Sequence, residues 1–385
     1  MNKNKTHIIK IGIFSFRLPS GGLPRVFVKE FQGLKSIKHS CFAFACQKAF
    51  PNYYDEMVKV TNLFLLDKST KLRKPLRRVW QTLNCLDRVT KCVKQEKLDI
   101  ILSHEIKSTF FLIPSILVWK KKVITFLHDN PFLFEAQEAD PYFYLPDIIK
   151  LLMRRFIIIA MKMSKFVVCT SEGIYESTKS LNLPNLVKIP YGIEYNYKET
   201  EPASPKDILL TVSSWSKFRQ PEQYLDLIPL LDLNVKFIIA GHWSDGKIKE
   251  SFVEKVRDRG FGLKVTIIED VSEEMLADLY RRAIAFIRFG FSERGTGQGI
   301  YEALGYGVPV IINESLGATE IIENGKHGLV LPLEDESFVR KEIRDLLSDD
   351  VKLKLMSTEC LILAKTHSWE NYIMTLSNII DEAIG

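Results

Sequence analysis

Several features that would point directly to a function are missing from these 385 residues. No segment reaches the roughly 18 apolar residues of a membrane span, and the longest apolar run, 110–119, is closed by three lysines and predicts a buried helix. The N-terminus leads straight into a strand-like run and lacks a signal peptide's small-residue cleavage site. The six cysteines form no CxxC pair and no cluster with histidine, so no metal site is predicted. Reduced thiols in a cytosolic protein fit this cysteine usage best.

The glycine fingerprint of a dinucleotide-binding dehydrogenase is also absent. It should follow the first predicted strand, where the chain has Ser20, Gly21 and Gly22 instead. A Rossmann dehydrogenase is therefore a weak alternative.

Basic residues are concentrated in the first half of the chain. Up to residue 195 there are 31 Lys and Arg against 16 Asp and Glu, a net charge of +15, and the remainder carries −9. The densest basic segment, Lys68–Trp80, runs into a predicted amphipathic helix. Two interpretations stay open: a solvated helix face, or attraction to an anionic membrane surface or a phosphate-bearing acceptor. Nucleic acid is not expected as a partner, because no nucleic-acid module is recognisable.

Strand-like runs alternate with helical stretches twice along the chain. These runs are apolar on both faces, which suits parallel sheets covered by helices. The polar, proline-containing segment 195–206 predicts a linker between the two sets. We therefore predict an α/β fold of two doubly wound, Rossmann-like parallel-sheet domains, residues 1–198 and 205–366, with a C-terminal helix, 367–385, packing back on the first. The expected strands are 8–16, 41–45, 99–104, 123–128, 166–171 and 187–190, then 208–213, 235–240, 265–268, 285–289, 308–312 and 329–331.

Residues 291–312, FSERGTGQGIYEALGYGVPVII, carry the most informative pattern. Gly295, Gly297 and Gly299 remove side chains from a loop that leads into a predicted helix. The first amides of a helix have no intrahelical partner and carry partial positive charge, so they stabilise a phosphate. Glu302 in the first turn could accept hydrogen bonds from sugar hydroxyls. An ordinary loop–helix–strand joint is the alternative for this segment taken alone.

In doubly wound sheets, ligands bind beyond the carboxyl ends of the strands. Glycine-rich loops, cations and carboxylates follow several expected strands here, and this set suits a sugar nucleotide. The residues are Gly21, Gly22, His128, Ser214, Lys217, Arg219, Gly241, Glu293, Arg294, Gly295, Thr296, Gly297 and Glu302.

Segments spread over nearly the whole chain resemble, in their order, the retaining GT-B glycosyltransferases of family 4. Each segment is weak evidence alone, and the ordered set is strong. The resemblance implies two domains facing across a cleft. The segments are 11–25, 98–104, the strand ending at His128, 167–172, 188–194, 291–312, 323–330 and 368–370.

The resemblance also implies roles for the residues at strand ends. Gly22 would offer its amide to the donor diphosphate, and His128 would contact the donor sugar. Arg219 and Lys217 would neutralise the leaving diphosphate, and Glu302 would bind the ribose hydroxyls. Gly21, Ser214, Gly241 and residues 293–297 would complete the donor site.

Two departures from the family pattern stand out. Ser214 occupies the position of the usual arginine, with Arg219 at the lysine position and Lys217 between them. The paired glutamates, Glu293 and Glu302, have eight residues between them rather than the family's seven, and Arg294 takes the spaced position. These departures are where sugar specificity or loss of activity is expected.

The function implied is transfer of a sugar from a UDP- or GDP-linked donor to a hydroxyl of a glycan or lipid-linked acceptor, as a hexosyltransferase, with retention of configuration. Fixed cations and helix amides would stabilise the leaving group, so no metal or other cofactor is expected. No DxD pair is placed to hold a divalent ion on the diphosphate. The protein is expected to be cytoplasmic, with peripheral contact to an anionic membrane through its basic first domain.

Two further alternatives remain. The chain could be a non-catalytic relative that binds a sugar nucleotide or a partner protein, which the changes at Ser214 and Arg294 favour. Another GT-B enzyme, such as an epimerase or a phosphorylase, fits less well, because the segments 189–194 and 368–370 resemble family 4.

Overall fold

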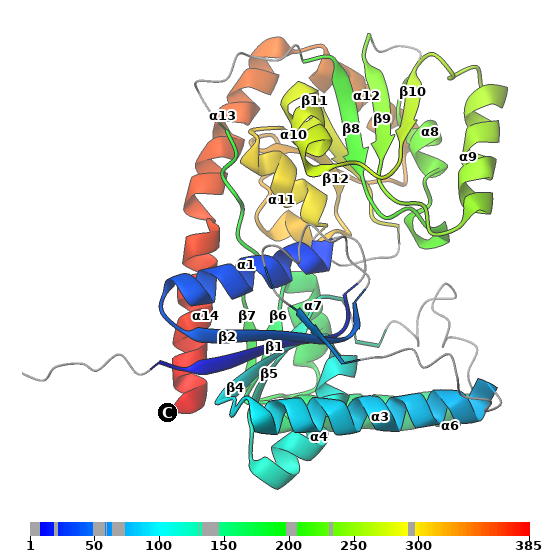
Figure 1. Cartoon of the computed structure of the whole chain (residues 1–385). Helices are drawn as coiled ribbons and strands as arrows, with labels where there is room; N and C mark the ends of the chain where they lie inside the picture. Colours follow the sequence, from blue (N-terminus) through cyan, green and yellow to red (C-terminus); the bar gives the residue numbers. More distant parts are fainter. Residues whose placement is uncertain are drawn as a thin grey trace, which may run out of the picture. The chain divides into compact units, whose positions relative to one another are not determined.

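The computed structural model describes residues 8–18, 22–48, 58, 60–63, 74–129, 131–132, 146–197, 206–230, 234–291 and 297–385. These residues divide into two compact units, shown in Figure 1. Unit 1 holds the described residues up to 132, those from 146 to 191, and those from 369 to 385. Unit 2 holds the described residues from 192 to 368.

Unit 1 is built on a seven-stranded sheet with the order β3-β2-β1-β4-β5-β6-β7, in which all the pairs are parallel. Its central strands have no accessible face: all five residues of β4 are buried. The strands are β1 (Lys10–Leu18), β2 (Ser40–Lys48), β3 (Val60–Asn62), β4 (Ile100–His104), β5 (Lys122–Leu127), β6 (Phe166–Cys169) and β7 (Leu186–Lys188). The helices are α1 (Gly22–Ser36), α3 (Lys74–Gln95), α4 (Ile106–Trp119), α6 (Asp147–Met163), α7 (Glu172–Lys179) and α14 (Trp369–Ile384).

Unit 2 contains a six-stranded parallel sheet with the order β10-β9-β8-β11-β12-β13. Several of its helices are capped at the N-terminus by a side chain that accepts a hydrogen bond from a backbone amide of the first turn. Ser272, for example, accepts a hydrogen bond from the Met275 amide at 3.2 Å. The strands are β8 (Ile208–Val212), β9 (Lys236–Ala240), β10 (Val265–Ile268), β11 (Ala283–Arg288), β12 (Val310–Asn313) and β13 (Gly328–Leu331). The helices are α8 (Gln223–Leu227), α9 (Gly246–Asp258), α10 (Glu273–Arg282), α11 (Gln298–Gly305), α12 (Glu336–Leu347) and α13 (Asp350–Thr366), with 3₁₀ turns at Lys217–Arg219 and Gly317–Glu320.

Each sheet has one point where the strand order reverses. In unit 1 the point lies between β1 and β4, and in unit 2 it lies between β8 and β11. Connections leave in opposite directions on the two sides of such a point, which opens a crevice beyond the carboxyl ends of the two strands. The reversal points therefore give the expected position of a ligand in each unit.

The predicted α/β class with two parallel sheets is confirmed, and every expected strand is present within a few residues. The short strand β3 was not predicted. The apolar run 110–119 does form a helix, α4, but the expectation that it is buried is wrong at its C-terminal end, where Leu117 and Val118 are 66% and 69% exposed.

The C-terminal helix α14 packs against α1 within unit 1. At Gly33 in α1 an added Cβ would lie 2.5 Å from the Ile373 side chain, so only glycine allows the two helices to approach this closely. The helical tail from residue 336 is three helices, of which α12 and α13 belong to unit 2 and α14 to unit 1.

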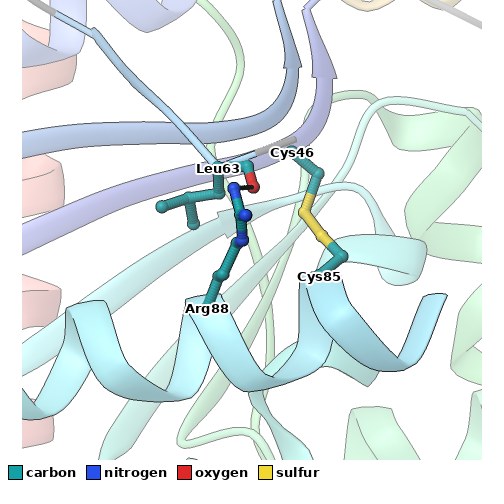
Figure 2. The surroundings of a disulfide bond; sticks show 4 residues. All are labelled: Cys46, Leu63, Cys85 and Arg88. Atoms are coloured by element: carbon teal, nitrogen blue, oxygen red, sulfur yellow. Dashed lines mark hydrogen bonds between the residues drawn. A yellow bond between two sulfur atoms is a disulfide. The ribbon is translucent and has the colours of Figure 1, made fainter. Parts of the chain in front are cut away.

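A disulfide joins Cys46, in β2, to Cys85, in α3 (Figure 2). Beside it, Arg88 Nη1 donates to the carbonyl oxygen of Leu63 at 3.2 Å, as Figure 2 also shows. The expectation of six reduced thiols is therefore wrong for this pair. The two residues are separated by 39 positions, and only the packing of α3 onto the sheet brings them together. The free cysteines are Cys41, Cys92, Cys169 and Cys360.

Candidate functional site

His128, the predicted sugar-contacting residue, belongs to a chain of polar side chains in unit 1 that runs from Tyr372 to Tyr191. It directly follows β5, and its Nε2 lies 3.0 Å from Nδ1 of His104, the last residue of β4. His104 Nε2 lies 2.8 Å from Oε2 of Glu30, and both of these side chains are fully buried. Glu30 Oε1 accepts a hydrogen bond from the Tyr372 hydroxyl at 2.5 Å. At the other end, His128 Nδ1 pairs with the hydroxyl of Tyr191.

The Tyr372 end of this chain has a defined direction, because the Tyr372 hydroxyl donates to Glu30. His104 Nε2 and Glu30 Oε2 lie at ion-pair distance from one another. The contacts of His128 with His104 and Tyr191 join ring nitrogens, and the tautomer of each ring decides which atom donates.

Burial keeps His128 neutral. Loss of hydration, and secondarily the neighbouring His104, lowers the pKa of His128 well below its usual range. Burial also raises the pKa of the Tyr372 hydroxyl well above its usual range, and the Glu30 carboxylate adds to that effect. His128 is thus an uncharged imidazole, and Tyr372 remains protonated as a donor.

Aromatic rings surround the Tyr191 end of the chain. The rings of His128 and Tyr191 stack with centroids 6.0 Å apart. Trp369 and Tyr372, from α14, lie at centroid distances of 6.3 and 6.2 Å from the Tyr191 ring. Ring packing of this kind fixes the orientation of the imidazole.

The predicted glycine loop of unit 1 lies only partly in the described structure. Gly22 is the first residue of α1, so its amide belongs to the first turn of that helix. Gly21 and the two residues before it lie outside the described residues.

In unit 2, the residues after β8 follow a short irregular path. Ser214 is exposed, and Trp215 is fully buried, with its backbone amide donating to the His242 carbonyl oxygen at 2.7 Å. Lys217 and Arg219 then form a single 3₁₀ turn. Lys217 is exposed, and the Arg219 guanidinium lies 5.7 Å from the ring centroid of Phe218.

Gly241 has a packing role that accounts for its glycine. It follows β9 with φ +118°, and an added Cβ would lie 2.0 Å from the Ser213 carbonyl oxygen. The chain after β9 therefore crosses directly over the chain after β8, which no other residue would allow.

Helix α11 follows the reversal point of unit 2. Its N-cap, Gly297, has φ 68° and, being glycine, has no side chain to cap the helix. At Gly299 an added Cβ would lie 2.9 Å from the Phe286 ring and 3.5 Å from the Val212 carbonyl oxygen. The start of α11 therefore lies against the carboxyl end of β8, just before Ser214.

Glu302 is held by a neighbouring helix. Its Oε2 accepts a hydrogen bond from the hydroxyl of Tyr280, in α10, at 2.8 Å, and that hydroxyl is 3.3 Å from the Gly299 carbonyl oxygen. The Tyr280 ring is 1% exposed and stacks on Tyr306 at 5.3 Å. Tyr280 therefore fixes the carboxylate in the second turn of α11. The prediction that Glu302 lies in the first turn is wrong, because the helix begins at Gln298. Glu293, Arg294, Gly295 and Thr296 lie outside the described residues.

The structure thus groups the predicted residues by unit. In unit 2 the loop with Ser214 and Gly241 and the start of α11 with Gly297 and Glu302 gather around the end of β8. In unit 1, His128 is joined by residues that the sequence interpretation did not assign. They are Glu30, His104, Tyr191 and Tyr372, and Tyr280 was likewise missed in unit 2.

The described residues contain neither a metal-binding cluster nor a membrane-spanning helix. No group of three or more His, Cys, Asp or Glu side chains in that part of the chain is arranged to hold a metal ion. None of the helices described is long and apolar enough to cross a membrane.

The second half of the chain is similar in sequence to a known protein family. Residues 194–359 match the family model described as "Glycosyl transferases group 1". A curated relative, the spore coat protein SA of Bacillus subtilis (strain 168), is 28% identical over 155 residues. That match covers 38% of this chain and 41% of the relative, so it spans less than half of either protein.

Solved structures similar to the chain extend over nearly its whole length. Sucrose-phosphate synthase from Thermosynechococcus elongatus matches with a TM-score of 0.79 at 15% identity, covering 97% of this chain and 98% of that one. HepE from Anabaena, in complex with UDP and glucose, matches with a TM-score of 0.76 at 12% identity, covering 97% and 100%. A mutant of TarM from S. aureus matches with a TM-score of 0.72 at 12% identity, covering 97% and 99%. The chain therefore has the two-sheet α/β fold of the GT-B glycosyltransferases, and its residues 194–359 match the family model of the group 1 glycosyl transferases.

Proposed function

We propose that this protein is a retaining glycosyltransferase of family 4, which transfers a hexosyl group from a nucleotide diphosphate sugar to a hydroxyl of a glycan or lipid-linked acceptor. Unit 2 binds the nucleotide sugar and unit 1 binds the acceptor. UDP-sugars are the first donors to test, because the HepE crystal structures contain UDP or UDP-glucose, and GDP-sugars are the second.

The observation that carries this proposal is the arrangement at the start of α11. Its N-cap, Gly297, has no side chain to cap the helix, and its second turn carries a carboxylate held by Tyr280 beside the end of β8. Amides at a helix start stabilise a diphosphate. The Glu302 carboxylate accepts hydrogen bonds from the ribose hydroxyls, and Tyr280 keeps it oriented while they bind.

The departing diphosphate gains negative charge, which Lys217 and Arg219 neutralise from the turn after β8. Ser214 donates its hydroxyl to a phosphate in place of the family's arginine. Gly21, Gly22 and residues 293–297 provide backbone amides and side chains around the phosphates and the sugar. Stabilising the departing diphosphate in this way requires no metal ion. A phosphate oxygen takes the proton of the acceptor hydroxyl.

His128 contacts the donor sugar in this proposal as a neutral imidazole. In this proposal Nδ1, which pairs with the Tyr191 hydroxyl in the structure, is the atom that meets a sugar hydroxyl. The sugar hydroxyl replaces the tyrosine there.

A binding and turnover experiment tests the proposal. UDP- and GDP-sugars are screened by thermal shift, and hydrolysis of any stabilising donor is then measured. A donor at about 100 times its dissociation constant adds roughly 2.7 kcal/mol of stability. Glu302→Gln should weaken the donor about 10- to 150-fold, because a hydrogen bond to a charged group contributes about 1.5–3 kcal/mol.

Glu336→Gln is the matched control, since its side chain is 62% exposed and belongs to the same unit. Equal donor affinity in the Glu302 and Glu336 variants would refute the assignment of Glu302. Donor binding with no turnover for any acceptor would favour the non-catalytic alternative, to which the serine at position 214 also points.

A further inference from the structure

Helix α6 in unit 1 has an inner face that packs in the usual way. Ile157, Ala160 and Met161 are buried, and Ile157 and Met161 belong to a core cluster with residues of β5, β6 and α7. The helix also packs beside α4 (Figure 1). This face satisfies the need of the helix for a hydrophobic contact with the unit.

The outer face of α6 is also apolar. Six large apolar side chains on this 17-residue helix are between 40% and 63% exposed. At about 3.6 residues per turn four of them fall on the side opposite the buried residues, and Ile149 and Phe156 lie at its flank, next to Ala160. The six are Ile148, Ile149, Leu151, Leu152, Phe156 and Ile159.

A helix that has apolar side chains on its outer face as well as its inner face ordinarily buries both. A surface helix of a soluble unit would instead carry polar residues here, so the composition of the outer face calls for a second apolar environment. With 17 residues and five charged side chains, α6 is not a membrane-spanning helix. It is long enough to lie along a surface.

The charges of α6 indicate what kind of surface its outer face contacts. Arg155 and Lys162 are exposed along one edge of the outer face, and Lys150 and Arg154 are the other cations of the helix. Its one acidic residue is Asp147, in the first turn. A second copy of the chain on a two-fold axis would place Arg155 and Lys162 near their own equivalents, which is unfavourable. Anionic lipid headgroups attract these cations, and the acyl boundary accepts the apolar side chains.

We propose that α6 is a membrane-binding helix, whose outer face inserts into the interfacial region of an anionic lipid bilayer while Arg155 and Lys162 meet the headgroups. This inference deepens the proposed function, because it gives the membrane contact of a lipid-linked acceptor a defined surface. The basic segment Lys68–Trp80 lies partly outside the described residues and is not needed for it.

Vesicle co-sedimentation tests the proposal. The whole protein is mixed with vesicles of phosphatidylglycerol and phosphatidylcholine, or of phosphatidylcholine alone. The wild type should sediment with the anionic vesicles, and Leu152→Gln/Phe156→Gln should bind them at least tenfold more weakly. Arg155→Gln/Lys162→Gln should lose about fivefold per charge at low salt. The matched control, Val351→Gln/Leu355→Gln on α13, changes side chains that are 72% and 65% exposed in unit 2 and should bind as the wild type does.

A second measurement does not depend on loss of binding. Phe156→Trp should show quenching of its fluorescence by brominated lipids, and Val351→Trp should not. Failure of the wild type to sediment, or equal losses in the α6 and α13 double variants, would overturn the proposal. So would a wild-type dimer that becomes a monomer in Leu152→Gln/Phe156→Gln without any binding to vesicles. Donor hydrolysis in vesicle-free buffer is measured separately, so a failed membrane contact is distinguishable from a failed enzyme.

Discussion

Replacing Glu30 by glutamine tests the buried polar chain of unit 1. The amide keeps the shape of the side chain but presents one acceptor and one donor in place of two acceptors. In the structure, Tyr372 donates to one oxygen at 2.5 Å, and His104 Nε2 lies 2.8 Å from the other. In Glu30→Gln one of these two neighbours therefore faces an N–H₂ group.

The size of the effect follows from the burial of the pair. Glu30 and His104 are both fully buried, so water does not replace the lost partner. Leaving one buried donor unsatisfied costs about 1–3 kcal/mol, and breaking a buried ion pair costs about 3–5 kcal/mol. We expect Glu30→Gln to lower the free energy of unfolding by about 3 kcal/mol, between these two cases.

Urea denaturation followed by circular dichroism at pH 7.5 measures this change. The matched control is Glu176→Gln: this carboxylate pairs with Lys179 at 3.0 Å, but its side chain is 53% exposed. Exposed pairs contribute about 0–1 kcal/mol, so the control should be almost as stable as the wild type. A double-mutant cycle of Glu30→Gln with Tyr372→Phe should give a coupling energy of about 1.5–3 kcal/mol.

Two results would refute the reasoning. One is a stability of Glu30→Gln within about 0.5 kcal/mol of the Glu176→Gln control, since distant surface changes stay within that range. The other is a coupling energy to Tyr372 near zero, which would mean that the hydroxyl and the carboxylate do not act together. Either outcome would mean that the buried carboxylate does not hold the polar chain of unit 1 together.

Three further predictions concern other parts of the chain. Burial lowers the pKa of His128, so the unfolded chain takes up that proton first. The free energy of unfolding should then fall below about pH 6.5, by up to about 1.4 kcal/mol per pH unit, and His128→Gln should flatten this slope in urea titrations at pH 7 and 5. Gly241→Ala should cost at least about 2 kcal/mol in thermal denaturation, because its φ is +118° and its Cβ would meet Ser213, whereas Gly246→Ala, with open space around it, should cost less than about 1 kcal/mol. Cys85→Ser should lower the free energy of unfolding by about 3–4 kcal/mol, because the disulfide closes a loop with a sequence separation of 39 residues. Adding a reductant to the wild type should cause the same loss, and Cys92→Ser, which removes a free cysteine, should cause little change. These results together would confirm the bond.

The fold could be predicted from the sequence because its signals are local. Runs such as Ile208–Val212 are apolar on both faces and therefore identify strands of a covered parallel sheet. Gly297, just before α11, could also be placed as a loop residue, since its φ of 68° favours glycine. The strand β3, Val60–Asn62, was missed.

The partners of the candidate site residues could not be predicted in the same way. Tyr372 and Glu30 are separated by 342 positions, and Tyr280 and Glu302 come from different helices. No periodicity specifies which loop or helix end lies opposite which. The Cys46–Cys85 bond was missed for the same reason, since spacing alone does not show which cysteines the packing of α3 brings together.

One signal for the polar chain was nevertheless present. In α1, Glu30 shares the buried side of the helix with Phe27 and Leu34, which are spaced three and four residues from it. A carboxylate on the apolar side of a helix is stable only if a buried donor or cation meets it. Such a residue therefore predicts a partner even where the sequence cannot say which one. In this protein the partners are His104 and Tyr372, and through them α1 and α14 hold the buried polar chain that contains His128.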